Sequence, residues 1–357
     1  MLVAYVSGHG FGHATRTCEV LRAVRGLSPG LPITIVGAVS ERLVRLEVAE
    51  PFAYRGAECD VGLSQRDALV IDEEGTALRC RAFEASWEKR LAEEVAFLRQ
   101  SGARAVLGDI PPLAFAAAER AGVQSLGLGN FSWDWIYRHL ARRQPSLACS
   151  ADRAKQAYAR AGLLLELPFA GDLSAFPRRC PIGLVARRPR VDRAEARQRL
   201  GLDSRPTVLL SFGGVGLPGL DTSRLAQDEE LRYLFPEELG GDRLEALGLG
   251  YPDIVGAADV VMTKPGYGIV SDAIGAGTRL VYTERGDFPE YPIMVREMSS
   301  YLACVHIGNE DLRGGRLAEP VRRALSMPMP AAPDLGGAKR AAARILAVLE
   351  SGRVPSS

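Results

Sequence analysis

The sequence lacks the patterns that mark disulfide-stabilised, metal-binding and membrane-spanning proteins. Its six cysteines are widely separated and include no C-x-x-C pair, so neither a disulfide framework nor a metal cluster is expected. It contains no run of about 18 apolar residues that could span a bilayer. The apolar stretch at residues 2–6 is too short for a signal peptide. These absences predict a cytoplasmic protein without bound metal or membrane insertion.

The sequence also lacks an excess of positive or negative charge. The 44 Lys and Arg residues nearly balance the 43 Asp and Glu residues, which gives a net charge of +1. Only four of the basic residues are lysine, and the arginines are scattered among acidic residues. Nucleic acid is therefore not an expected partner. The 357 residues amount to about twice a typical domain, so two domains are expected.

The N-terminal segment predicts a strand, a glycine loop and a helix in succession. Residues 2–6 form an apolar run typical of a buried strand, and helical spacing of apolar residues begins after Ala14. The loop between them holds three glycines and half of the chain's histidines: Gly8, His9, Gly10, Gly12 and His13. Such a loop can bring backbone N–H groups close to a phosphate, carboxylate or sugar hydroxyl. The alternative is a tight turn with two incidental histidines, because the spacing is not the dinucleotide pattern G-x-G-x-x-G.

A strand predicted at 105–110 carries an acidic residue at a position where ligands bind. Asp109 lies near its carboxyl end, where open α/β sheets bind ligands. The alternative is that Asp109 caps a helix predicted at 113–121. Alternation of further short strands with helices predicts a parallel α/β sheet.

The three tryptophans of the chain lie in two places. Residues 76–101 predict one long amphipathic helix, with an apolar stripe that belongs to the core: Leu78, Phe83, Trp87, Leu91, Val95 and Leu98. After a strand at 124–129, Trp133 and Trp135 are interleaved with polar residues. This cluster suits a sugar or an amphipathic acceptor, and equally a helix packed on its own domain.

The second half of the chain repeats the arrangement of the first. Prolines and glycines indicate an interdomain connection at 171–190. A strand and glycine loop at 206–216 then open a second α/β domain, and another strand ends at the turn 263–268. Acidic residues at 284–292 suit vicinal hydroxyls, although a solvated loop is the alternative. Residues 217–250 give no clear pattern.

Four motifs occur in an order that resembles a known family: GHGFGHATR at 8–16, NFSWDWIY at 130–137, SFGG at 211–214 and KPGYGIVSD at 264–272. They resemble the N-terminal, glycosyltransferase-like half of plant L-arabinokinase over about residues 3–325, and more distantly the MurG type of glycosyltransferase. The resemblance implies a GT-B architecture, in which two Rossmann-like α/β domains face each other across a cleft. No phosphate loop of a sugar kinase is found, so kinase activity is not expected.

The resemblance also implies a domain plan. Residues 1–170 would form the acceptor-side domain and 171–190 the linker. Residues 191–334 would form the nucleotide-sugar domain, and a helix at 335–350 would pack back on the first domain.

Individual roles follow from the resemblance as well. His13 takes the place of the base that deprotonates the acceptor, and Asp109 would orient its imidazole. The donor-side residues would be Gly213, Gly214, Lys264, Gly266, Tyr267, Gly268, Asp272, Asp287 and Glu290. The acceptor-side residues would be Gly8, His9, Gly10, Gly12, Arg16, Trp133 and Trp135. Asp272 stands where related enzymes have a ribose-binding glutamate and is one methylene shorter.

These observations predict a metal-independent, inverting glycosyltransferase that uses a nucleotide sugar, with UDP as the expected nucleotide, and a small acceptor. No other cofactor is expected. Two alternatives stay open: a non-catalytic nucleotide-sugar-binding module, and a nucleotide-sugar epimerase. The epimerase would need a histidine facing the donor, and His306 is the only histidine in the second domain.

Overall fold

The computed structural model describes residues 1–48, 51–213, 217 and 219–354. The chain divides into two compact units. Unit 1 consists of Met1–Ser64, Ile71–Val185 and Asp334–Ser357, and unit 2 consists of Gln65–Val70 and Ala186–Pro333. The expected plan assigned 65–70 to the first domain and 171–185 to the linker; here they belong to unit 2 and unit 1, respectively.

Among the described residues, unit 1 contains a seven-stranded sheet of order β3-β2-β1-β6-β7-β8-β9, in which every neighbouring pair is parallel. Its strands are β1 (Leu2–Val6), β2 (Ile33–Gly37), β3 (Ala53–Gly56), β6 (Ala105–Asp109), β7 (Gln124–Gly129), β8 (Leu163–Glu166) and β9 (Arg179–Pro181). The central strands β1, β2 and β6 are buried along their whole length, which explains their nearly continuous apolar sequences. Strand order reverses at β1, so the carboxyl ends of β1 and β6 lie side by side.

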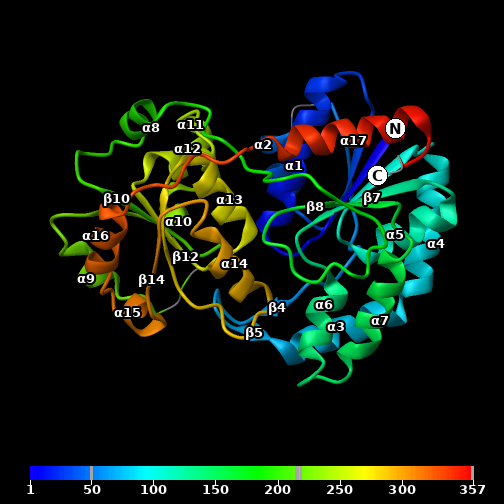
Figure 1. Ribbon diagram of the computed structural model, residues 1–357, viewed down its shortest axis with the longest axis horizontal. Coiled ribbons are helices and arrows are strands. Elements are labelled where there is room, and N and C mark those ends of the chain that lie inside the picture. The colour runs from blue at the N-terminus through cyan, green and yellow to red at the C-terminus, as the bar shows by residue number, and fades with distance from the viewer. Residues whose placement is uncertain (49–50, 214–216, 218, 355–357) are drawn as a thin grey trace. The chain divides into compact units, whose positions relative to one another are not determined.

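Helices cover this sheet. They are α1 (Phe11–Leu27), α2 (Glu41–Glu47), α3 (Glu73–Ala85), α4 (Trp87–Gln100), α5 (Pro112–Ala121), α6 (Trp133–Leu140), α7 (Leu147–Tyr158) and α17 (Gly337–Ser351). Helix α17 packs along α1, as Figure 1 shows for the red and blue helices. The guanidinium of Arg104, just before β6, donates a hydrogen bond to the carbonyl oxygen of Leu349 on α17. The C-terminal helix is therefore part of unit 1.

The single long helix predicted at 76–101 is wrong. The chain forms two helices, α3 and α4, which are separated at Ser86. The Ser86 hydroxyl donates to the carbonyl oxygen of Phe83 (3.0 Å), a local bond that competes with the helical ladder. One member of the predicted core stripe is also wrong, because Leu78 is 62% exposed.

Unit 2 is also a parallel α/β layer structure. Over the described residues its sheet has five strands in the order β11-β10-β12-β13-β14. The strands are β10 (Thr207–Ser211), β11 (Arg232–Leu234), β12 (Val260–Thr263), β13 (Arg279–Tyr282) and β14 (Cys304–His306). The order reverses at β10, so the carboxyl ends of β10 and β12 are neighbours, with Ser211 opposite Thr263.

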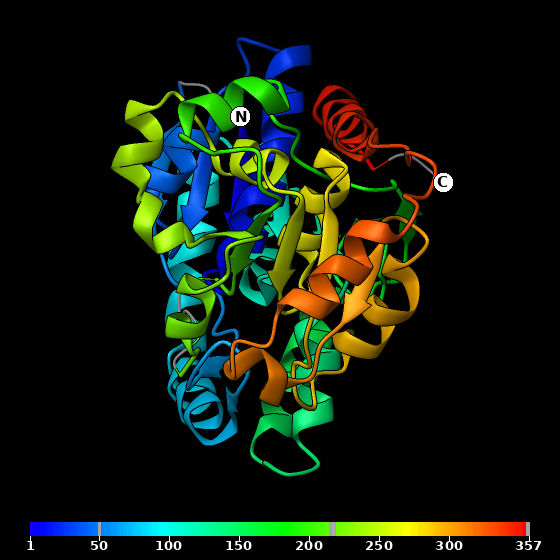
Figure 2. The ribbon, with the colours of Figure 1, turned by 90° about the vertical axis from the view of Figure 1, so that its left-hand side faces the viewer.

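The helices of unit 2 are α8 (Arg193–Arg199), α9 (Thr222–Ala226), α10 (Pro236–Leu239), α11 (Gly241–Ala246), α12 (Tyr251–Ala257), α13 (Tyr267–Ala276), α14 (Glu290–Met298), α15 (Asn309–Arg313) and α16 (Ala318–Ser326). Figure 2 shows α16, in orange, running across the sheet. The indistinct stretch 217–250 contains short elements, among them the three-residue strand β11. Elements of this length carry too few residues to show a period.

A segment from the first half of the chain belongs to unit 2. The segment 65–70 contains the last residue of β4 (Ser64–Gln65) and the turn that leads to its partner strand β5 (Ile71–Asp72). Ala68 and Leu69 join the buried hydrophobic core of unit 2. The carboxylate of Asp67 pairs with Arg313 of α15 (3.4 Å). Apolar burial and charge pairing therefore both attach this segment to unit 2.

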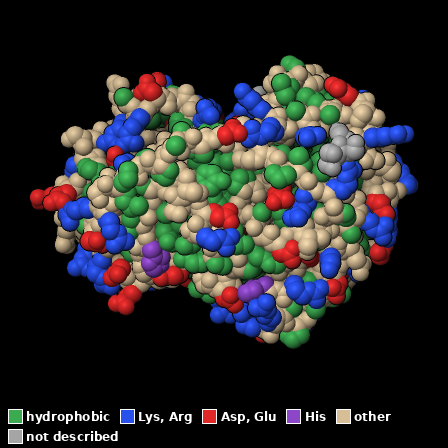
Figure 3. Space-filling model, in the orientation of Figure 1, with side chains coloured by type: hydrophobic (Ala, Val, Ile, Leu, Met, Phe, Trp, Pro, Cys, Tyr) green, Lys and Arg blue, Asp and Glu red, His purple; other side chains and the backbone are tan. Residues whose placement is uncertain are grey.

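Surface charge follows the sequence expectation. Over the described residues on the face shown in Figure 3, basic and acidic side chains are interspersed rather than gathered by sign. In the part of the chain that the structure describes, no helix has both the length and the apolar character needed to cross a membrane.

Candidate active site

Sheet topology brings His13 and Asp109 together in unit 1. His13 lies in the first turn of α1, which follows β1, and Asp109 is the last residue of β6. Strands β1 and β6 are neighbours, with Val6 opposite Asp109, so the loop after β1 passes the end of β6. The His13 Nδ1 and Asp109 Oδ1 atoms are 2.7 Å apart, and both side chains are buried. Asp109 does not cap α5, whose N-cap residue is Pro111 without a side-chain cap.

Arg16 completes a buried network around the Asp109 carboxylate. Its Nε atom donates to Asp109 Oδ2 (2.7 Å) and its Nη2 atom to Oδ1. The Thr17 hydroxyl donates to Oδ2 (2.8 Å), and Arg16 Nη1 donates to Asn130 Oδ1 (2.8 Å). Burial alone would raise the pKa of Asp109, but the charges of Arg16 and His13 and their hydrogen bonds outweigh it and hold the pKa at about 2. The carboxylate is therefore ionised at neutral pH.

The ionised carboxylate determines which nitrogen of His13 carries the proton. A carboxylate can only accept hydrogen bonds, so the 2.7 Å contact requires a hydrogen on Nδ1. The 3.0 Å approach of Arg16 Nη2 to the same nitrogen is then a contact between two donors. In neutral His13 the lone pair consequently lies on Nε2. Within the described part of the chain, no group forms a hydrogen bond to Nε2.

Aromatic rings surround the imidazole of His13. The ring centroids of Phe131, Trp133 and His9 lie 5.5, 6.2 and 6.4 Å from its own. Trp133 is fully buried and donates from Nε1 to Asp60 Oδ2 (2.9 Å). Its indole is therefore anchored in the interior of unit 1 beside His13, and its acceptor-side role stays a prediction. Trp135 is partly buried on α6, and a Cβ on Gly171 would collide with its ring.

The glycine loop presents backbone at the surface beside this network. Gly8 and Gly10 are exposed and Gly12 is partly buried. Gly10 has φ 78, a conformation that glycine adopts without steric cost. His9 is held in place because its Nδ1 accepts a hydrogen bond from the Leu63 backbone N–H (3.1 Å). The loop thus contains two imidazoles held by hydrogen bonds, His9 before Gly12 and His13 after it.

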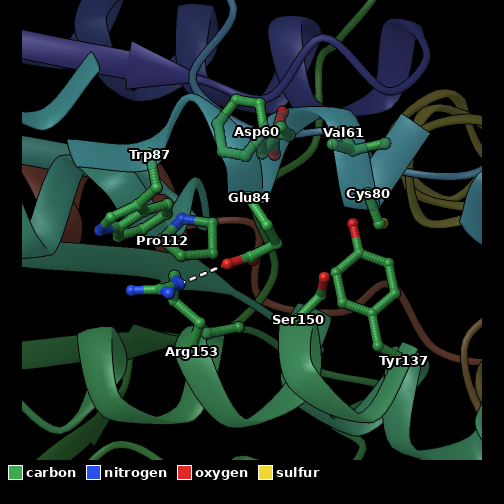
Figure 4. A pocket seen from close by; sticks show the side chains of 11 residues that line it. Asp60, Val61, Cys80, Glu84, Trp87, Pro112, Tyr137, Ser150 and Arg153 are labelled. Carbon is green, nitrogen blue, oxygen red and sulfur yellow. Dashed lines mark hydrogen bonds and ion pairs between the residues drawn. The ribbon is translucent and has the colours of Figure 1, made fainter. Parts of the chain in front are cut away.

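Asp60 is a site residue that the sequence motifs did not indicate. It is buried, and burial raises its pKa even though the Ser7 hydroxyl, the charge of His13 and the Trp133 indole oppose that shift. The sequence indicates Asp60 only weakly: it is an acidic residue between two apolar neighbours, Cys59 and Val61. Asp60 lines a hollow together with Tyr137, Ser150 and Cys80 (Figure 4). The ion pair between Arg153 and Glu84 belongs to the same lining.

In unit 2, two strand-end turns contain the expected phosphate-facing residues. Gly213 follows β10 with φ 77; Gly214 lies outside the described residues. Lys264 follows β12, and its Nζ donates to the carbonyl oxygen of Ala68. Burial, with the nearby charge of Arg285, lowers the pKa of Lys264 to about 8. Because β10 and β12 are adjacent, these turns lie at the strand-order reversal of unit 2.

The helix after Lys264 begins without a side-chain cap. Gly266 is its N-cap residue, and the first turn of α13 contains no acidic side chain. Tyr267 is buried at the first helical position, and Gly268 is partly buried. A helix N-terminus of this kind favours a bound anion.

The structure places Asp272 and Glu290 differently from the sequence expectation. Both are buried in ion pairs: Asp272 Oδ1 accepts from Arg187 Nε (3.1 Å), and Glu290 Oε2 accepts from Arg285 Nη1 (3.1 Å). Each carboxylate therefore has a charged partner within the protein. Asp287 is exposed. The partner arginines were missed, and no sequence signal links Arg187 to an acid 85 positions away.

Among the residues that the structure describes, no group of three or more His, Cys, Asp or Glu side chains is placed to hold a metal ion.

Sequence comparison gives one curated relative. No protein-family model matches the chain. The chain is 30% identical over 344 residues to L-arabinokinase of Arabidopsis thaliana, a match that covers 90% of this chain and 32% of that protein. The predicted resemblance is confirmed, and the chain spans about a third of the length of the curated relative that it matches.

Solved glycosyltransferases are similar over nearly the whole chain. The glycotransferase of kitacinnamycin matches with a TM-score of 0.58 and 16% identity, covering 98% of this chain and 95% of that one. A UDP-glucosyltransferase from Polygonum tinctorium matches with a TM-score of 0.58 and 14% identity, covering 98% of both chains. Arabidopsis thaliana UGT89C1 complexed with quercetin matches with a TM-score of 0.60 and 13% identity, covering 99% and 96%. At these identities the likeness shows the fold, and the predicted GT-B fold is confirmed.

Proposed function

We propose that this protein is a glycosyltransferase that moves a sugar from a nucleotide donor, with UDP-sugars as the first candidates, to a hydroxyl of a small acceptor. The observation that carries the proposal is the buried pair of His13 and Asp109, whose Nδ1 and Oδ1 atoms are 2.7 Å apart. This pair lies at the strand-order reversal of a sheet in a GT-B fold. An imidazole that donates through Nδ1 to a carboxylate retains a lone pair on Nε2 and is suited to general-base catalysis.

The proposed reaction is a single displacement. His13 Nε2 accepts the proton of the acceptor hydroxyl while the acceptor oxygen attacks the anomeric carbon. The bond from that carbon to the diphosphate oxygen breaks, the diphosphate leaves with the electron pair, and the anomeric configuration inverts. Asp109 stays ionised and stabilises the imidazolium that forms. Positioned general bases typically contribute about 100- to 10,000-fold to a rate.

Donor binding is assigned to the strand-end turns of unit 2. The N–H groups at Gly213 and at the N-terminus of α13, together with Lys264, would hold the diphosphate. They would stabilise the charge that develops on the leaving group, a task for which other glycosyltransferases use a metal ion. Asp272 and Glu290 enter this proposal only indirectly, because they orient Arg187 and Arg285.

Named ligands of similar structures support the choice of candidates. Structures of UGT89C1 are complexed with UDP, with UDP-L-rhamnose and with quercetin. The structure of glycosyltransferase VinC is complexed with dTDP, so the test must include other nucleotides.

The first test is thermal unfolding with a panel of nucleotides and nucleotide sugars, each with and without EDTA. A ligand at about 100 times its Kd adds roughly 2.7 kcal/mol of stability. Stabilisation by UDP and one UDP-sugar, unaffected by EDTA, is the expected result. That sugar is then offered with acceptor panels to the wild type and to His13→Ala. The variant should lose about 100-fold or more in turnover while its stabilisation by the donor persists.

Each other outcome has a defined meaning. Stabilisation by GDP or dTDP instead of UDP would revise the nucleotide assigned to the donor and would support the transferase proposal. Donor binding without turnover on any acceptor would favour a non-catalytic binding module. No response of the folded protein to any nucleotide would contradict the proposal.

A further inference from the structure

Two residues next to the candidate active site have a strained backbone. Among the described residues, Ile110 (φ 57) and Phe169 (φ 62) are the non-glycine residues with positive φ. For a β-branched residue such as isoleucine this conformation is a true outlier. Ile110 also precedes Pro111, and a following proline normally forces an extended backbone. Strained residues persist only where their surroundings hold them.

Both strained residues are hydrogen-bonded through their carbonyl oxygens. The Tyr158 hydroxyl donates to the Ile110 carbonyl oxygen (2.7 Å). The Asn130 side-chain amide donates to the Phe169 carbonyl oxygen (3.4 Å), while its oxygen accepts from Arg16. Ile110 directly follows Asp109, the acid of the candidate pair. The strain therefore lies in the turns that aim Asp109 and Asn130 at Arg16.

The Tyr158 hydroxyl connects two turns of unit 1. It donates to Ile110, after β6, and accepts a hydrogen bond from the Trp133 backbone N–H (3.3 Å), after β7. The ring of Tyr158 is fully buried and stacks on Phe176, with centroids 4.6 Å apart and ring planes at 26°. A buried, stacked ring leaves its hydroxyl little freedom, so the hydroxyl can act as a fixed point for both turns.

We infer that Tyr158 is a positioning residue of the candidate active site: its hydroxyl holds Ile110 in the left-handed conformation and thereby aims the Asp109 carboxylate at His13. Without this bond, Ile110 can relax toward the extended region. The adjoining Asp109 carboxylate then turns away from Nδ1, and His13 loses the contact that fixes its tautomer. The geometric part of this inference stands by itself, and its catalytic consequence rests on the proposed function.

The experiment is ¹⁵N NMR of the imidazole ring nitrogens, because protonated and unprotonated nitrogens have well-separated shifts. In the wild type at a pH where His13 is neutral, Nδ1 should appear protonated and Nε2 unprotonated. The variant Tyr158→Phe keeps the ring and removes the hydroxyl. It should show a mixture of both tautomers of His13. The spectrum needs neither donor nor acceptor, so it tests the positioning role even if no transferase activity is found.

Tyr54→Phe is the matched control. The Tyr54 hydroxyl also bonds backbone carbonyls, those of Gly37 (3.0 Å) and Val39, neither of which belongs to the turn after β6. Both variants should lower the unfolding temperature, but the control should keep the wild-type His13 signals. Unchanged signals in Tyr158→Phe would overturn the inference, as would equal changes in both variants. If Tyr158→Phe does not fold, Phe176→Leu, which removes the stacked ring, should broaden the same signals; sharp wild-type signals there would also overturn it.

Discussion

Replacing Asp109 with asparagine tests the network on which the candidate site depends. The substitution keeps the shape of the side chain and removes its charge. In the wild type the Asp109 carboxylate accepts from Arg16, His13 and Thr17, and it is fully buried. The Asp109→Asn variant would remove the negative charge that pairs with the buried guanidinium of Arg16. Removing one partner of a buried ion pair typically costs about 3–5 kcal/mol.

The pKa of Asp109 gives a second value for the stability that this carboxylate contributes. Folding lowers it from 3.8 to about 2. At about 1.4 kcal/mol per pKa unit, this difference corresponds to roughly 2–3 kcal/mol of stability at neutral pH. An asparagine oxygen can still accept one or two of the hydrogen bonds, so the expected loss is about 3 kcal/mol, the lower end of the ion-pair range. For a unit of this size that is a drop of roughly 6–12 °C in the unfolding temperature.

The direction of the pH dependence follows from the lowered pKa. The stability that Asp109 contributes is fully present above pH 3.8, which is the ordinary pKa of the carboxyl group. It is lost as the pH falls toward the pKa of about 2 that Asp109 has in the folded protein. Wild-type protein should therefore lose stability through this window, and Asp109→Asn should lack that part of the loss. Thermal unfolding followed by circular dichroism at about pH 7 and at intervals from about pH 5 down to about pH 2.5 measures both effects.

Asp152→Asn is the control for charge removal as such. Asp152 pairs with Arg138 at the surface, with a side chain that is 58% exposed. Its loss should change stability by less than about 0.5 kcal/mol. An Asp109→Asn protein that unfolded within about 1 °C of the wild type and retained the acid-induced loss would refute the role assigned to this carboxylate.

Two further predictions concern unit 2. Burial lowers the pKa of Lys264 to about 8, and a diphosphate favours the charged amine, so stabilisation by UDP should decline as the pH rises above 8. Lys264→Met should abolish that decline. UDP-induced shifts in unfolding temperature from about pH 6.5 to about pH 9.5 measure the effect, and a flat profile in the wild type would contradict the role assigned to Lys264. Glu290→Gln should lower the unfolding temperature, because Arg285 loses the charge of its ion-pair partner. It should also weaken the binding of UDP and of UDP-sugar by the same factor, as measured by titration calorimetry. A loss of affinity confined to the UDP-sugar would instead indicate a direct contact between Glu290 and the sugar.

The sequence by itself determined the parallel α/β organisation and the candidate catalytic pair. Strands β1, β2, β6, β7 and β10 are short apolar runs bounded by turn residues, which are local signals that need no knowledge of distant contacts. The pairing of Asp109 with His13 and the role of the turn that contains Lys264 came from the resemblance of the motifs. The general rule that open α/β sheets bind ligands at the carboxyl ends of their strands favours the same position for Asp109.

Tertiary structure alone decided which charges neutralise one another. Asp272 was expected to face ribose, but in the buried interior it is paired with Arg187, and Glu290 is likewise paired with Arg285. Asp60 became visible only through its contact with Trp133. A buried carboxylate must find a donor, and its choice depends on which side chains share the same water-free space.

The tertiary structure also decided the assignment of the segment 65–70 and the tautomer of His13. Leu69 and its neighbour joined the core of unit 2 because that core offered apolar surface to bury, although the segment lies between elements of unit 1. His13 could be recognised from its glycine loop, but only the position of the Asp109 oxygen shows which nitrogen carries the hydrogen. Local patterns specify elements and residue types, whereas burial and hydrogen-bond geometry arise only when distant segments meet.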